Sequence, residues 1–150
     1  MTYATRSIIM ILVLSIMAAC STAGSSCPVT EPQWILPPDD PAVNNEPAYG
    51  YYYANDDQTI LASAGWIGEE SYLRTGENGN KMGWFRPEGA DLVITGRRLD
   101  GESSSLEAHV PCCYPTRFQA TGLAFPAEGC WEVTAKADDN ELTFVVRIEP

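Results

Sequence analysis

Apolar and polar residues alternate most regularly near the end of the chain, over residues 129–148. The apolar positions are Trp131, Val133, Ala135, Ala137, Leu142, Phe144, Val146 and Ile148. A period of two is typical of a β-strand with one buried face, whereas an amphipathic helix repeats every three or four residues. Because Asp138, Asp139 and Asn140 interrupt the alternation, the pattern predicts an antiparallel hairpin with an Asx-rich turn. One hairpin cannot bury its own apolar face, so we expect a second sheet above it.

Shorter strand-like segments, separated by turn residues, precede this hairpin. The strongest of the turn signals is Asn78-Gly79. No long segment has the apolar spacing of a helix. We expect strands within residues 49–54, 59–63, 81–86, 91–97, 105–110 and 118–123. Seven or eight short strands at this spacing predict an all-β fold, a single immunoglobulin-like β-sandwich.

Residues 1–19 have the organisation of an export signal. Arg6 precedes an apolar run over residues 8–17, and two alanines precede Cys20. The run is shorter than the roughly 20 residues of a transmembrane helix, so we expect the segment to be removed after export. A cysteine in this place resembles the lipobox of bacterial lipoproteins, in which it is acylated and becomes the mature N-terminus. Met17 departs from the leucine that is usual there. The resemblance implies lipid attachment at Cys20.

The composition of residues 20–47 predicts a tether between the lipid and a folded domain over residues 48–150. Serine and glycine at its start favour flexibility, and the six prolines that follow favour an extended chain. The apolar residues 34–36 leave two interpretations open, a free tether or one that docks on the domain.

The charge of the chain excludes some partners. Its 150 residues include 20 acidic and 9 basic ones, which gives a formal net charge of −11. A nucleic-acid-binding face needs clustered lysine and arginine, so we expect no nucleic acid as a partner. The same balance disfavours electrostatic docking on anionic lipid, which leaves the lipid on Cys20 as the expected contact with the membrane.

Two motifs carry a further resemblance. The segment over residues 94–110 begins Ile-Thr-Gly-Arg-Arg-Leu-Asp, and the segment over residues 118–148 contains Gly-Cys-Trp-Glu-Val-Thr. Together they resemble an uncharacterised family of bacterial secreted or lipid-anchored proteins that end in a similar hairpin. The resemblance implies an extracytoplasmic β-sandwich and no assigned activity.

Four cysteines remain after Cys20, namely Cys27, Cys112, Cys113 and Cys130. An even number in an exported chain favours disulfide bonds over a thiolate metal or redox site. A bond between adjacent cysteines is uncommon, and Cys130 falls on the polar face of its strand. We therefore expect Cys130 to pair with Cys112 or Cys113, and Cys27 with the other.

Residues for catalysis are sparse. His109, the single histidine, is expected to face solvent, and no Gly-x-Ser-x-Gly motif accompanies it. Carboxylates at Asp56, Asp57, Glu69 and Glu70 leave a glycoside hydrolase open, and the Asx-rich turns leave calcium open. Such residues are frequent in turns, so we expect no catalytic residue, metal site or cofactor.

Aromatic residues gather in the first half of the domain. Neighbouring residues of a strand point to opposite faces, so not all of these rings fit into one core. The candidates for an exposed binding surface are Tyr49, Tyr51, Tyr52, Tyr53 and Trp84. We expect a lipid-anchored protein of the cell envelope that acts as a non-catalytic binding or interaction module for a protein or glycan ligand. The alternatives are a carbohydrate-binding module, with clustered exposed rings, and a small envelope hydrolase, with a polar cleft.

Overall fold

The computed structural model describes residues 26–43, 46–64, 73–76 and 80–150. The expected export signal, Cys20, the hairpin signal at Asn78-Gly79 and the carboxylates of Glu69 and Glu70 lie outside the described residues. The described residues form strands, turns and loops with no helix, as the alternation predicted.

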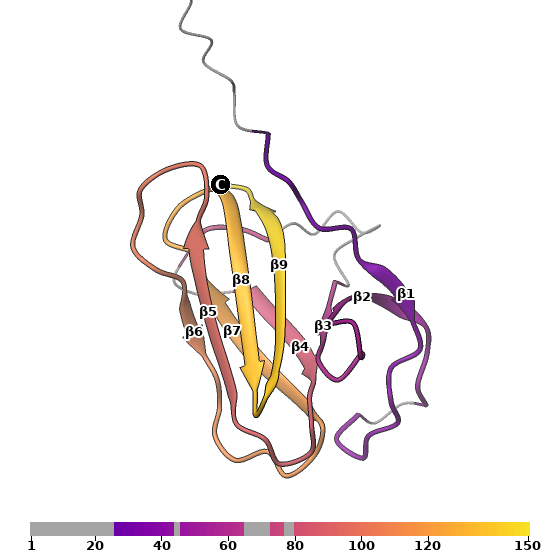
Figure 1. Ribbon diagram of the computed structural model, residues 1–150. Coiled ribbons are helices and arrows are strands. Elements are labelled where there is room, and N and C mark those ends of the chain that lie inside the picture. Colours follow the sequence, from indigo (N-terminus) through magenta and orange to yellow (C-terminus); the bar gives the residue numbers. More distant parts are fainter. Residues whose placement is uncertain (1–25, 44–45, 65–72, 77–79) are drawn as a thin grey trace, which may run out of the picture.

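Within the described ranges, nine strands form two antiparallel sheets packed as a sandwich (Figure 1). The strands are β1 (Gln33–Ile35), β2 (Gly50–Ala54), β3 (Leu61–Ser63), β4 (Asn80–Phe85), β5 (Leu92–Arg98), β6 (Glu107–His109), β7 (Phe118–Ala124), β8 (Gly129–Ala137) and β9 (Asn140–Ile148). The larger sheet has the order β1-β2-β3-β4-β7-β6 and the smaller one β5-β8-β9. From β3 onward this is the strand order of an immunoglobulin constant-type domain, ABED against CFG. Strands β1 and β2 are additions that widen the first sheet.

The predicted C-terminal hairpin is confirmed as β8 and β9, paired without a bulge from Gly129↔Ile148 to Ala137↔Asn140. Asp138 in its turn has φ 51°, a left-handed conformation that Asx residues tolerate. The apolar face of the hairpin is buried against the larger sheet, where Trp84 and Trp131 are among the largest enclosed side chains. Each indole N–H is satisfied, because Trp84 donates to Thr121 Oγ1 at 2.9 Å and Trp131 donates to the Ala127 carbonyl at 2.9 Å.

The two motifs that carry the family resemblance lie side by side on β5 and β8. The Leu99 N–H donates to the Cys130 carbonyl at 2.7 Å, and the Cys130 N–H donates to the Asp100 carboxylate at 3.0 Å. Arg98 holds Asp100 from the other side, with Nε 2.8 Å from Oδ1. Gly129 has φ 124°, and a Cβ there would lie 2.6 Å from Asp100 Oδ1, so this corner requires glycine.

The segment expected to be a tether is part of the folded unit over residues 26–43, which we call the N-terminal strap. Thr30 exchanges two hydrogen bonds with Val145 of β9, each 2.9 Å long, before the chain enters β1. Beyond β1, the buried carboxylate of Asp40 accepts N–H bonds from Ala42, Arg117 and Phe118 at 2.7–2.9 Å. Of the apolar residues 34–36, Ile35 is buried whereas Trp34 and Leu36 are exposed. The described strap is therefore attached to the sandwich through Thr30, the pairing of β1 with β2, and Asp40.

Candidate functional site

The larger sheet extends past the smaller one on the side of β1 and β2 (Figure 1). Tyr51 and Tyr53 share one face of β2 because they are two residues apart. Tyr53 lies inside the sandwich and stacks on Phe144 of β9, with ring centroids 4.2 Å apart. The same face continues outward to Tyr51 and Tyr49, where both side chains are exposed. A face that is core at one end of β2 is thus open to solvent at the other.

Trp34, Tyr49 and Tyr51 form a cluster on this open face, which we call the aromatic platform. Trp34 lies directly opposite Tyr51 in the β1–β2 register, and their ring centroids are 4.8 Å apart at 64°. The rings of Trp34 and Tyr49 are nearly parallel, at 11°, with centroids 6.2 Å apart. The exposed fractions are 60% for Trp34, 59% for Tyr49 and 41% for Tyr51. Contiguous exposed apolar surface of this kind marks a contact surface more often than a scattered ring does.

Of the five expected surface aromatics, the structure brings only Tyr49 and Tyr51 together. Trp84 and Tyr53 are wrong as surface candidates, because they are 0% and 2% exposed. Tyr52 points to the opposite face of β2 and lies half-buried against Phe85, with centroids 6.1 Å apart. Trp34 was missed as a ring of the surface. The signal that could have found it is the spacing of residues 31–35, which places Trp34 on the opposite face from Glu31, Gln33 and Ile35. This spacing locates the ring only once β1 is known to pair with β2.

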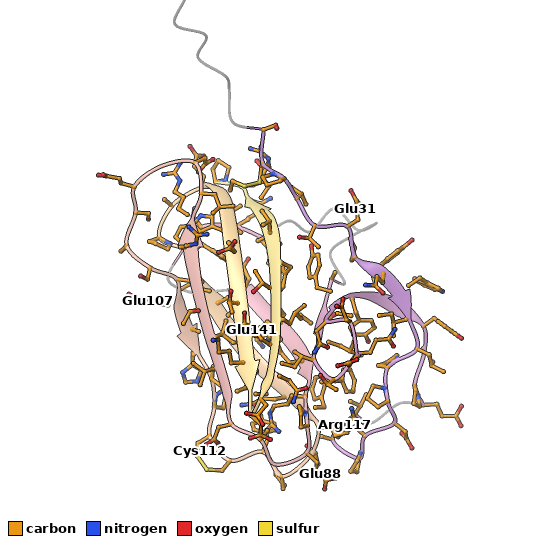
Figure 2. All side chains as sticks on the ribbon, in the orientation of Figure 1. Glu31, Glu88, Glu107, Cys112, Arg117 and Glu141 are labelled. Atoms are coloured by element: carbon orange, nitrogen blue, oxygen red, sulfur yellow. A yellow bond between two sulfur atoms is a disulfide. The ribbon has the colours of Figure 1, made fainter. Side chains whose placement is uncertain are left out.

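The strap brings a negative charge close to Tyr53, which lies on the same face of β2 as Tyr51. Burial raises the pKa of Tyr53 from its ordinary 10.0 to about 12, and the charge of Glu31 adds to the effect. Glu31 is exposed and precedes Trp34 by three residues. Figure 2 shows its side chain projecting from the strap on the side of β1. A carboxylate here, in a chain of net charge −11, disfavours an anionic ligand on the platform.

A second hollow joins the two Asx-rich turns. Asp56, Asp57, Asp139 and Glu141 line it, in an open volume of about 430 Å³. Thr59 bridges the turns, since its hydroxyl accepts from Asn55 Nδ2 at 2.7 Å and donates to Asn140 Oδ1 at 2.8 Å. Within the described ranges, no group of three or more His, Cys, Asp or Glu residues has an arrangement that could hold a metal ion. The turns thus meet, but their carboxylates form an acidic rim without a metal-binding geometry.

The cysteine pairing differs from the prediction. Cys27 is bonded to Cys130, with Cα atoms 5.3 Å apart, and Cys112 is bonded to its neighbour Cys113. Cys130 is the second residue of β8, which starts at the end of the sandwich where the chain terminates (Figure 1). Cys112 lies at the opposite end (Figure 2). The seven-residue strand β7 spans roughly 23 Å between these ends, too far for a disulfide. Cys130 faces away from the core between the two sheets, on the opposite face of β8 from Trp131, as the alternation predicted. The strap covers it there, so its partner is Cys27.

A buried cation holds the loop that contains Cys112 and Cys113. Arg86 donates from Nε to Gln119 Oε1 at 2.8 Å and from Nη2 to the Tyr114 carbonyl at 3.0 Å. Its Nη1 reaches the carbonyls of Pro87 and Thr116, at 2.9 and 3.3 Å. Burial lowers the pKa of the Arg86 guanidinium, and more distant carboxylates oppose this effect. With its donors bound to the protein, Arg86 has a structural role.

No known protein family, curated protein or solved structure matches the chain. Over the residues that the structure describes, no helix has the length and apolar character to cross a membrane.

Proposed function

We propose that the protein is a lipid-anchored, extracytoplasmic binding module without a catalytic role, and that the aromatic platform contacts its ligand. The observation that carries the proposal is the overhang of β1 and β2. It leaves Trp34, Tyr49 and Tyr51 uncovered on a face that is core elsewhere in the sheet. Large rings cost little side-chain entropy on binding and supply much contact area, so they are frequent at contact surfaces.

A neutral saccharide is the ligand class that this surface favours. The flat faces of indole and phenol rings can stack on the C–H faces of sugar rings, and the hydroxyl of tyrosine adds a hydrogen-bonding edge. The acidic chain and Glu31 disfavour anionic ligands at this place. The strap supports display outward from a membrane, because the disulfide Cys27–Cys130 fixes the folded unit seven residues after the expected lipid site at Cys20.

Glycan-array binding tests the proposal. Full-length protein should bind a subset of neutral glycans, and Trp34→Ala should lose that binding while the protein stays folded.

The hydrolase is a second candidate, because four carboxylates line the hollow between the Asx-rich turns. It predicts cleavage of a glycan that Asp56→Asn and Asp139→Asn abolish, an outcome that would replace the binding-module proposal.

A further inference from the structure

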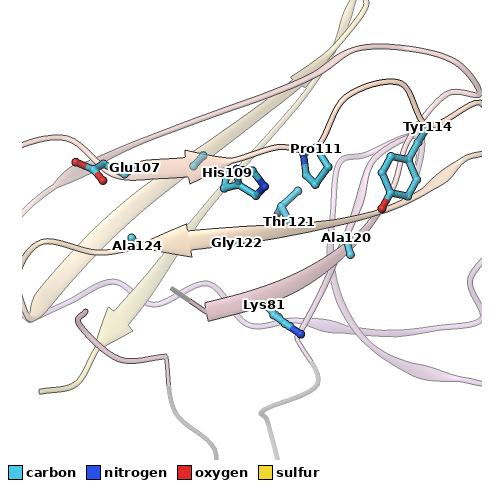
Figure 3. Close-up of a pocket in the computed structure, with 10 residues that line it drawn as sticks. Lys81, Glu107, His109, Pro111, Tyr114, Ala120, Thr121, Gly122 and Ala124 are labelled. Atoms are coloured by element: carbon cyan, nitrogen blue, oxygen red, sulfur yellow. The ribbon is translucent and has the colours of Figure 1, made fainter. Parts of the chain in front are cut away.

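A groove lies over the outer face of β4, β7 and β6, away from the aromatic platform (Figure 3). Its volume is about 650 Å³, within the range of small-molecule sites. The floor is β7, which presents Ala120, Gly122 and Ala124 outward. Figure 3 shows Lys81 and His109 on opposite sides of β7, with Glu107 at one end of the groove and Tyr114 at the other.

Gly122 is a glycine that neither backbone nor packing requires. Its φ is not in the left-handed region, and β7 pairs without a bulge on both sides. A Cβ there would meet only the Cβ of His109, at 3.8 Å, which is an ordinary contact. At Gly83 and Gly96, by contrast, a Cβ would lie 3.0 Å from Phe118 and 2.9 Å from Leu106. A strand glycine without such a reason often marks the close approach of a ligand.

Two nitrogen donors flank this gap in one row across the sheet. Lys81 and His109 are each the register partner of Gly122, on β4 and β6 respectively. Their Cα atoms are therefore about 10 Å apart, two strand spacings. The described salt bridges leave Lys81 without an acidic partner. An anionic group over Gly122 would lie between these two donors.

The ends of the groove set the direction of such a ligand. Glu107 lies opposite Ala124 in the register and repels an anion at that end. Toward the other end, the groove has an apolar floor at Ala120 and an apolar wall at Pro111. The ring of Tyr114 closes this end. The ligand that fits has a carboxylate over Gly122 and a flat apolar body beside Tyr114.

We propose that this groove is a second binding site, independent of the aromatic platform, for small organic carboxylates with an aromatic body. The carboxylate binds between Lys81 and His109 over Gly122, and the ring of the ligand packs along Ala120 against Tyr114.

NMR titration of the full-length protein in detergent micelles with phenylacetate tests this site. We expect saturable shifts at the amides of His109, Gly122 and Lys81, and no such shifts with phenylacetamide, the neutral control. Gly122→Val, whose Cβ would meet His109 Cβ at an ordinary 3.8 Å, fills the gap and should weaken binding at least about tenfold. Lys81→Gln, which removes a charged hydrogen bond, should weaken it by a similar factor. Lys136→Gln, an exposed lysine on the other sheet, should leave binding unchanged.

Absence of site-specific shifts with phenylacetate would overturn the proposal, as would full binding by a folded Gly122→Val variant. Equal binding of phenylacetamide would overturn the carboxylate as the recognised group. None of these outcomes bears on the function proposed for the aromatic platform, because its rings lie elsewhere, on β1, β2 and the segment before β2.

Discussion

Cys27 is bonded to Cys130, a residue that follows it by 103 positions. The bond joins the strap to the start of β8, the first strand of the C-terminal hairpin, and Thr30 continues the contact along β9. The segment nearest the expected lipid is thus fixed to the core of the sandwich.

The double variant Cys27→Ser/Cys130→Ser should lower the free energy of unfolding by about 4 kcal/mol, because the bond closes a loop of about 100 residues in the unfolded chain. Urea unfolding of the oxidised protein measures the change. The matched control, Cys112→Ser/Cys113→Ser, should cost less than about 1 kcal/mol, since adjacent cysteines close almost no chain. Equal unfolding midpoints for the first variant and the parent protein would contradict the role given to Cys27–Cys130.

Arg86→Met should lower the free energy of unfolding by roughly 2–4 kcal/mol, because it leaves Gln119 Oε1 and the carbonyls of Tyr114 and Thr116 without their donor. Arg86→Lys should lie between the parent and the methionine variant, because one ammonium cannot reach all these acceptors. Chemical denaturation gives the values. Arg147→Met, at an exposed position, serves as the control and should change stability by less than about 0.5 kcal/mol. A result for Arg86→Met as small as that of the control would show that the buried network is not formed.

Stability should fall as pH rises from about 10 to about 12, because Tyr53 keeps its proton in the folded state to about 12 while it ionises near 10.0 in the unfolded chain. The unfolded state then binds fewer protons than the folded state, so the contribution is complete below pH 10 and is lost across this window. The measurement is the free energy of unfolding against pH for the parent and for Tyr53→Phe. The part of the fall that is due to Tyr53 should be absent in the variant; identical curves would contradict the buried position of its hydroxyl.

The fold was largely predictable, because strand alternation is local. The hairpin of β8 and β9 follows from Trp131 to Ile148 alone. Strand β1 was not predictable, since Gln33, Trp34 and Ile35 form a strand only through their partners on β2. Alternation also places Tyr52 and Tyr53 on opposite faces without saying which face is covered. Which of the two faces is covered depends on how strands distant in the sequence pack together, and so does the pairing of Cys27 with Cys130.

Lipid attachment gives a prediction of its own. Cells fed labelled palmitate should incorporate it into the full-length product, and the product should sediment with membranes. Cys20→Ser should abolish both, whereas Cys27→Ser should keep the label, because that cysteine belongs to the disulfide with Cys130. An unmodified, full-length product in the cytosol would contradict the anchored, exported state.

The most direct test of the binding module is a glycan array probed with the parent protein, Trp34→Ala and Val93→Ala. Val93 is an exposed apolar residue on β5 of the other sheet and controls for a general loss of apolar surface. Removing Trp34 should weaken binding about tenfold or more, the size expected for the loss of a central ring of a contact surface. We expect the parent and Val93→Ala to bind the same neutral glycans and Trp34→Ala to lose them with its fold intact. Binding by the Trp34→Ala variant at the strength of the parent, or no binding by the parent to any glycan, would contradict the assignment of the platform to a saccharide.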